Sequence, residues 1–193
     1  MPEAPTVEQL RAAVDAVEPL VAGVPDGRWT APTPCTDWDV RALVAHVVTG
    51  NQLVADVLAG RTTVEKFRAA APADPLGDAP LAAYRAAGDA VVAAFAVPGA
   101  LERPVTVPFG TVPGAVALHL RLTDVLVHGW DLARATGQEP AFPPGLAEQE
   151  LAFSAGAVQQ LPPGRSPFDA PREAPEGATA LDRLAALLGR TVG

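Results

Sequence analysis

The stretch that most constrains the fold runs from Ala117 to Gly137, where apolar residues recur at the spacing of an α-helix. At about 100° per residue, apolar residues gather on one side, and these are Leu118, Leu122, Val125, Gly129, Leu132 and Ala133. Polar residues gather on a different side, and these are Arg121, Asp124, His128 and Asp131. Gly137 is a typical stop signal after a helix. The stretch therefore predicts a long helix over roughly residues 114–136.

Asp124 and His128 are four residues apart on the polar side of this helix, one turn from each other. This spacing allows a carboxylate and an imidazole to converge on one metal ion, as the helical His-x3-His pair does in zinc sites. The same spacing suits an ordinary polar helix face. Spacing alone therefore leaves both interpretations open.

Length, charge and cysteine content narrow the class of protein. A chain of 193 residues fits one domain, and we expect a single domain over residues 1–193. The net charge of −8 argues against a nucleic-acid partner. Cys35 is the lone cysteine, which excludes an internal disulfide and favours a reducing cytoplasm. We find no secretory signal and no apolar run of membrane-spanning length, so we expect a cytoplasmic protein that contacts no membrane.

Further helices are predicted along the chain. Thr6 and Gln9 form a capping-box pattern that opens a helix to about Gly23, and Thr36 or Asp37 is placed to cap a helix over residues 38–59. Three more helices are expected at residues 79–96, at residues 143–160 before the break at Pro162–Gly164, and at residues 179–188. Residues 101–113 alternate and contain Pro and Gly, which indicates an extended segment.

These elements predict an all-α fold, a four-helix bundle with a short C-terminal helix. Connections of roughly twenty residues are longer than an up-and-down bundle needs, so we expect long crossover connections. His46 lies at the margin of the apolar face of the helix over residues 38–59. An imidazole there needs partners for both ring nitrogens, or a metal ion. The alternative is a core histidine that bonds to a backbone carbonyl.

Three separated segments resemble one known family. The segment from Thr33 to His46 resembles the opening of the mycothiol-dependent maleylpyruvate isomerase metal-binding domain family, in the DinB-like superfamily, and Asp124 to Gly137 resembles its second signature. The segment from Leu181 to Arg190 is similar to the tail of an actinobacterial subgroup. The resemblance implies a DinB-like four-helix bundle that holds a divalent metal, usually zinc or nickel. It implies His46, Asp124 and His128 as the ligands.

The resemblance also implies thiol chemistry on a small-molecule substrate. Three protein ligands leave coordination positions open, and an open metal lowers the pKa of a bound water or thiol. The activated thiolate of mycothiol would then add to an electrophile, as in an isomerase, or displace a group from it, as in an S-transferase. Characterised isomerases of the family carry Glu where this chain has Asp124, which is one methylene shorter. The alternatives are a non-catalytic binding or scaffold bundle that has lost metal chemistry, and a reaction without mycothiol such as a cyclisation or hydrolysis.

Two more residues are candidates for roles at this site. Asp131 is placed to orient an imidazole, and a surface ion pair with Arg134 or Arg121 is the alternative. Arg121 is placed to bind an anionic group of a cofactor, and a solvated side chain is the simpler expectation.

The remaining residues with distinctive chemistry have simpler expected roles. His119 points away from His128 around the helix, so we do not expect it to be a ligand. We expect Trp38 and Trp130 to pack, and Cys35 to be a small buried or cap-adjacent side chain and not a nucleophile. The oligomeric state stays open, with a homodimer among the alternatives.

Overall fold

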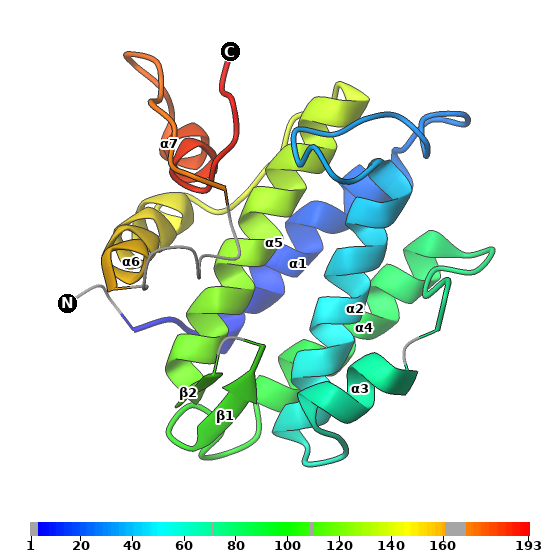
Figure 1. Ribbon diagram of the computed structural model, residues 1–193, viewed down its shortest axis with the longest axis vertical. Coiled ribbons are helices and arrows are strands. Elements are labelled where there is room, and N and C mark those ends of the chain that lie inside the picture. The colour runs from blue at the N-terminus through cyan, green and yellow to red at the C-terminus, as the bar shows by residue number, and fades with distance from the viewer. Residues whose placement is uncertain (1–3, 71, 109, 161–168) are drawn as a thin grey trace.

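A computed structural model of the protein describes residues 4–70, 72–108, 110–160 and 169–193. The chain is mostly helical, and four long helices pack together as a bundle (Figure 1). These helices are α1 (Val7–Ala22), α2 (Val40–Leu58), α4 (Pro80–Phe95) and α5 (Gly114–Thr136). α2 packs against α4 and α5, and α1 packs against the same two helices. The prediction of an all-α four-helix bundle is confirmed.

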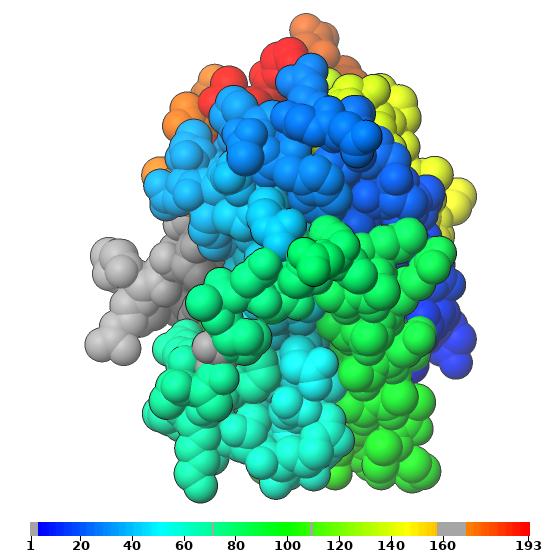
Figure 2. Space-filling view, turned by 90° about the vertical axis from the view of Figure 1, so that its right-hand side faces the viewer, coloured from blue at the N-terminus to red at the C-terminus, as the bar shows by residue number. Residues whose placement is uncertain are grey.

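The long connections of the bundle carry the smaller elements. α3 (Val64–Ala70) lies between α2 and α4, and an antiparallel hairpin of β1 (Pro104–Val107) and β2 (Gly110–Pro113) lies between α4 and α5. The hairpin occupies the predicted extended segment and sits beside the first turns of α5 (Figure 1). Figure 2 shows the face on which the chain from α3 to α4 forms most of the lower half. α3 and the hairpin lie toward the same end of the bundle (Figure 1).

Two further helices cover α5 from outside the bundle. α6 (Leu146–Gln160) and α7 (Ala180–Leu187) pack against each other and against α5. α5 is therefore buried on its polar side as well as its apolar side, and Arg121, His128 and Asp131 are all buried. The expected break at Pro162–Gly164 lies outside the described residues.

Local capping explains where the bundle helices begin and end. The capping box of α1 is present, because Gln9 N donates to Thr6 Oγ1 and Thr6 N donates to the Gln9 side chain. α2 is capped by Asp39, whose Oδ1 accepts from the backbone N–H of Ala42 at 2.8 Å. The prediction that Thr36 or Asp37 caps this helix was wrong, because the chain turns once more before α2 starts. Gly137 ends α5 with a φ of 71°, the left-handed conformation that favours glycine.

The described residues include no helix with the length and apolar character needed to cross a membrane.

Candidate metal centre

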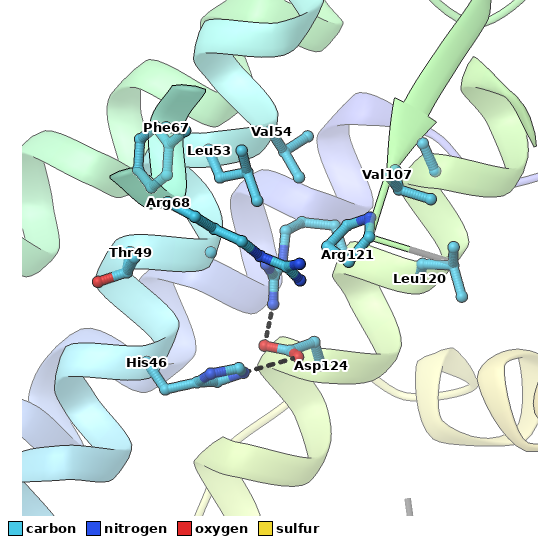
Figure 3. A pocket seen from close by; sticks show the side chains of 13 residues that line it. His46, Thr49, Leu53, Val54, Phe67, Arg68, Val107, Leu120, Arg121 and Asp124 are labelled. Atoms are coloured by element: carbon cyan, nitrogen blue, oxygen red, sulfur yellow. Dashed lines mark hydrogen bonds and ion pairs between the residues drawn. The ribbon is translucent and has the colours of Figure 1, made fainter. Parts of the chain in front are cut away.

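The structure brings together the three side chains that the sequence singled out. His46 projects from α2 toward Asp124 on the facing α5, as Figure 3 shows. Its Nε2 lies 3.3 Å from Asp124 Oδ1, and Nε2 of His128 lies 3.7 Å from the same oxygen. One donor atom from each of the three residues lies within 4.8 Å of the other two. Zinc bonds of about 2.0–2.1 Å in tetrahedral geometry place neighbouring donors roughly 3.3 Å apart, so this spacing fits a shared ion.

Asp131 contacts the imidazole of His128 from the same helix, three residues later. Its Oδ2 lies 3.1 Å from His128 Nδ1, and the Asp131 side chain is fully buried. Arg190, which follows α7, donates from Nη2 to the same oxygen at 2.9 Å. An ionised Asp131 would accept a hydrogen bond from Nδ1–H of His128, and the lone pair of Nε2 would then face Asp124.

The expected surface ion pair between Asp131 and Arg134 or Arg121 was wrong. Arg134 pairs with Asp182, and Arg121 pairs with Asp124. The reason is that α7 and the residues after it cover this side of α5, which the periodicity of α5 alone does not reveal.

Burial keeps both imidazoles of the candidate centre neutral. Loss of hydration lowers the pKa of His46 to about 4, and the positive charges of Arg121 and Arg190 act in the same direction. Loss of hydration also lowers the pKa of His128 to about 4, against the opposing hydrogen bond to Asp131. The His128 side chain is 3% exposed and that of His46 is 37% exposed, so His128 loses more of its hydration. A neutral imidazole is the form that binds a metal ion.

Arg121 is buried, so the expectation of a solvated side chain was wrong. Its side chain is 7% exposed, and its Nη2 forms an ion pair with Asp124 Oδ2. Its Nε has no hydrogen-bond partner among the described residues. A side chain at Gly50 on α2 would collide with Arg121 Nη1, so glycine provides the room for the guanidinium. Burial lowers the pKa of Arg121 to about 10, which leaves the group charged at neutral pH.

Trp38 covers the two imidazoles. Its ring centroid lies 4.3 Å from that of His46 and 5.5 Å from that of His128. The prediction that Trp38 packs did not identify the candidate ligands as its neighbours. Trp130 lies elsewhere and donates from Nε1 to Asp182 at 2.8 Å.

Two cavities flank the candidate centre and share His46, Leu120 and Asp124. The first, which we call the arginine cavity, has a volume of about 320 Å³. It is lined by His46, Thr49, Gly50, Leu53, Val54, Phe67, Arg68, Val107, Pro108, Ala117, Leu120, Arg121 and Asp124 (Figure 3). The second, which we call the polar cavity, has a volume of about 200 Å³. It is lined by Cys35, Thr36, Asp37, Trp38, His46, Leu120, Thr123, Asp124, His128, Asp169 and Arg190.

Cys35 lies close to the candidate centre. Its sulfur is within 4.8 Å of donor atoms of His128 and Asp131. Burial raises the pKa of this thiol, which favours the protonated form. That Cys35 is not a nucleophile stays a prediction; a protonated thiol is the less reactive form.

A buried polar network between α5 and α6 was not predicted. His119 Nδ1 lies 2.8 Å from Glu150 Oε1, and Thr123 donates to Glu150 Oε2 at 3.0 Å. The His119 ring also stacks on Phe153, with centroids 4.1 Å apart. His119 belongs to neither group of converging donors among the described residues.

Comparisons with known proteins agree with this architecture. A family model described as the mycothiol maleylpyruvate isomerase N-terminal domain matches residues 10–133. The uncharacterised protein Rv0738 of Mycobacterium tuberculosis (strain ATCC 25618 / H37Rv) is 41% identical over 182 residues, which cover 93% of this chain and 94% of that protein. The uncharacterised protein Rv0036c of the same strain is 28% identical over 196 residues, which cover 91% of this chain and 75% of that protein.

A solved structure shares the fold. The crystal structure of the mycothiol-dependent maleylpyruvate isomerase superposes with a TM-score of 0.62 at 18% identity, over 80% of this chain and 68% of that chain. Because the family model matches well over half of the sequence, this chain belongs to the mycothiol maleylpyruvate isomerase N-terminal domain family.

Proposed function

We propose that this protein is a metal-dependent enzyme that uses a low-molecular-weight thiol, of the isomerase or S-transferase type. The observation that carries the proposal is the convergence of His46, Asp124 and His128 from two facing helices between two cavities. Two neutral imidazoles and one carboxylate are a donor set suited to zinc or nickel. Three protein donors leave room for a further ligand, which is the arrangement of a catalytic site.

The side chains around the donors have distinct roles in this proposal. A bound divalent ion would supply acidity, because it stabilises a thiolate or hydroxide at neutral pH. Asp131 holds His128 in the tautomer whose Nε2 carries no proton, so that its lone pair can bind a metal ion. Trp38 excludes water from one side of both rings. Arg121 neutralises Asp124 Oδ2 and leaves Oδ1 facing the two histidines.

The two cavities provide separate places for two reactants. The polar cavity contains carboxylates, hydroxyls and Arg190, which suit a polar thiol such as mycothiol. The arginine cavity would take the electrophile. Addition of the thiolate sulfur to a conjugated double bond moves an electron pair onto a carbonyl oxygen. Rotation about the resulting single bond and departure of the same thiolate complete an isomerisation with no atom gained or lost.

The experiment is metal analysis combined with an activity assay. The protein contains three histidines, so His46→Gln and His128→Gln can be compared with a matched control, His119→Gln. We expect about one zinc or nickel ion per chain in the wild type and in His119→Gln, and loss of the ion in the other two variants. Mycothiol with maleylpyruvate tests isomerase activity, and mycothiol with an aryl or alkyl halide tests transfer. If the wild type takes up neither metal, a binding or scaffold bundle is the better interpretation.

A further inference from the structure

We propose that the arginine cavity binds an organic acid with one carboxylate and an apolar body, and that Arg68 and Arg121 hold the carboxylate. The cavity is lined by two candidate metal ligands, His46 and Asp124. That the acid is a substrate therefore rests on the proposed function. Binding of the acid itself requires only the two arginines and the apolar walls.

Arg121 supplies a buried positive charge at the inner end of the cavity. Its only ion pair among the described residues is with Asp124 Oδ2, and its Nε has no hydrogen-bond partner there. A buried guanidinium with an unused donor is costly unless a ligand pairs with it. Gly50 on α2 has no side chain, and any Cβ there would overlap the guanidinium of Arg121.

Arg68 supplies a second positive charge from another element. It lies on α3, and its side chain points into the same cavity as Arg121 in Figure 3. The residue is exposed and lines the cavity, which places it at the cavity mouth. No ion pair or side-chain hydrogen bond of Arg68 is found among the described residues, and its charge acts on the neighbouring Glu65. Two guanidinium groups at one cavity are suited to a carboxylate, because each can donate two parallel hydrogen bonds.

The charge balance of the cavity is opposite to that of the whole chain. The chain has a net charge of −8, yet the cavity lining contains two arginines and one acidic residue. That acidic residue, Asp124, is already paired with Arg121 and is a candidate metal ligand. The second guanidinium, that of Arg68, is left to attract an anion.

The other walls define the body of the ligand. They are mostly apolar, from Leu53, Val54, Phe67, Val107, Pro108, Ala117 and Leu120. A volume of about 320 Å³ is near the lower end for small-molecule sites, so the acid is small. A second carboxylate would lie against these apolar walls without a partner. We therefore infer that a monocarboxylate binds better than a dicarboxylate of the same length.

The test measures binding by calorimetry or ligand-observed NMR, without any reaction. The probes are trans-2-hexenoate, its neutral primary amide, and trans-2-hexenedioate. The variants are Arg68→Met and Arg121→Met, and the control is Arg61→Met, an exposed arginine that pairs with Asp56. We expect each cavity variant to bind hexenoate about tenfold more weakly, because a hydrogen bond to a charged group is lost. We expect unchanged affinity for the amide, and no change in the control.

Several results would overturn the inference. Equal wild-type affinity for hexenoate and its amide, tighter binding of the dicarboxylate, or an equal loss in Arg61→Met would each do so. If Arg121→Met fails to fold, the exposed Arg68→Met still decides the question. The assay is run with and without zinc. Preference for the acid in a protein that takes up no metal would refute the proposed function alone, whereas metal uptake without preference for the acid would refute this site alone.

Discussion

Nδ1 of His128 lies 3.1 Å from Oδ2 of Asp131, so the orientation of a candidate metal ligand is set by a carboxylate three residues later on the same helix. Asp131 is in turn held by Arg190, which is three residues from the C-terminus. A chain of contacts thus links the candidate centre to the segment that follows α7. Arg190 thus contacts the candidate centre through Asp131, and the described residues after α6 contribute none of its converging donor atoms.

The first prediction concerns the Asp131 carboxylate. We expect Asp131→Asn to bind zinc about 10- to 100-fold more weakly, because a neutral amide neither fixes the tautomer of His128 nor increases its basicity. Competition with a chromophoric chelator measures the affinity. Asp182→Asn is the control, since Asp182 also faces α5 but contacts Trp130 and Arg134 instead. Equal affinities in the wild type and Asp131→Asn would show that Asp131 has only a structural role.

A second prediction tests the room that Gly50 provides. A methyl group there meets Arg121 Nη1, whereas a methyl group at Gly156 on α6 meets no described atom. Replacing glycine by alanine within a helix raises helix propensity in both variants. The difference between their free energies of unfolding therefore reports the collision at Gly50. We expect Gly50→Ala to be less stable than Gly156→Ala by about 1–2 kcal/mol, from overpacking. Urea unfolding of both variants measures this, and a difference near zero would mean that the guanidinium moves freely.

The third prediction is a pH dependence of stability in the metal-free protein. The folded pKa of His128, about 4, is below its ordinary value near 6.5, so the unfolded chain takes up the proton first. Its stabilising contribution is complete above pH 6.5 and decreases as the pH falls toward 4. Between pH 7.5 and pH 5.0 the loss is about 2 kcal/mol. Urea midpoints in the presence of a chelator measure it.

The control for this prediction is His128→Gln, which removes the titrating group. His46, whose pKa is also lowered to about 4, and carboxylates with lowered pKa values, such as Asp74 and Asp182, titrate in both proteins and cancel in the comparison. We expect the variant to lose about 2 kcal/mol less than the wild type over the same pH range. An equal loss in both proteins would contradict burial of His128 in the neutral form.

The sequence predicted the elements that depend on local patterns. The helical period around Leu118 and Leu122, the capping box at Thr6, and Gly137 are short-range signals, and each is found in the structure. The convergence of His46 with Asp124 and His128 required the family resemblance as well, because two of these residues come from one helix and the third from another.

What the sequence did not predict depends on long-range packing. Burial of Arg121 and Asp131 requires α7 and Gly50 to lie against α5, and no periodicity in α5 encodes those neighbours. The pairing of His119 with Glu150 likewise joins two helices whose polar positions each look solvent-facing when taken alone. Polar residues on a helix thus indicate a polar environment, but not whether water or another helix provides it.

The last prediction concerns the buried pair of Asp131 and Arg190. Arg190→Met leaves a fully buried carboxylate without its guanidinium partner, and we expect a loss of about 3 kcal/mol in the free energy of unfolding. Asp131→Asn leaves the arginine unpaired and should also destabilise the fold. In the double variant neither charge remains, so the total loss should be smaller than the sum of the single losses, by about 2 kcal/mol. Urea unfolding of the four proteins gives this coupling energy. Additive losses would mean that Arg190 acts through its hydrogen bond to the Leu188 carbonyl, and not through Asp131.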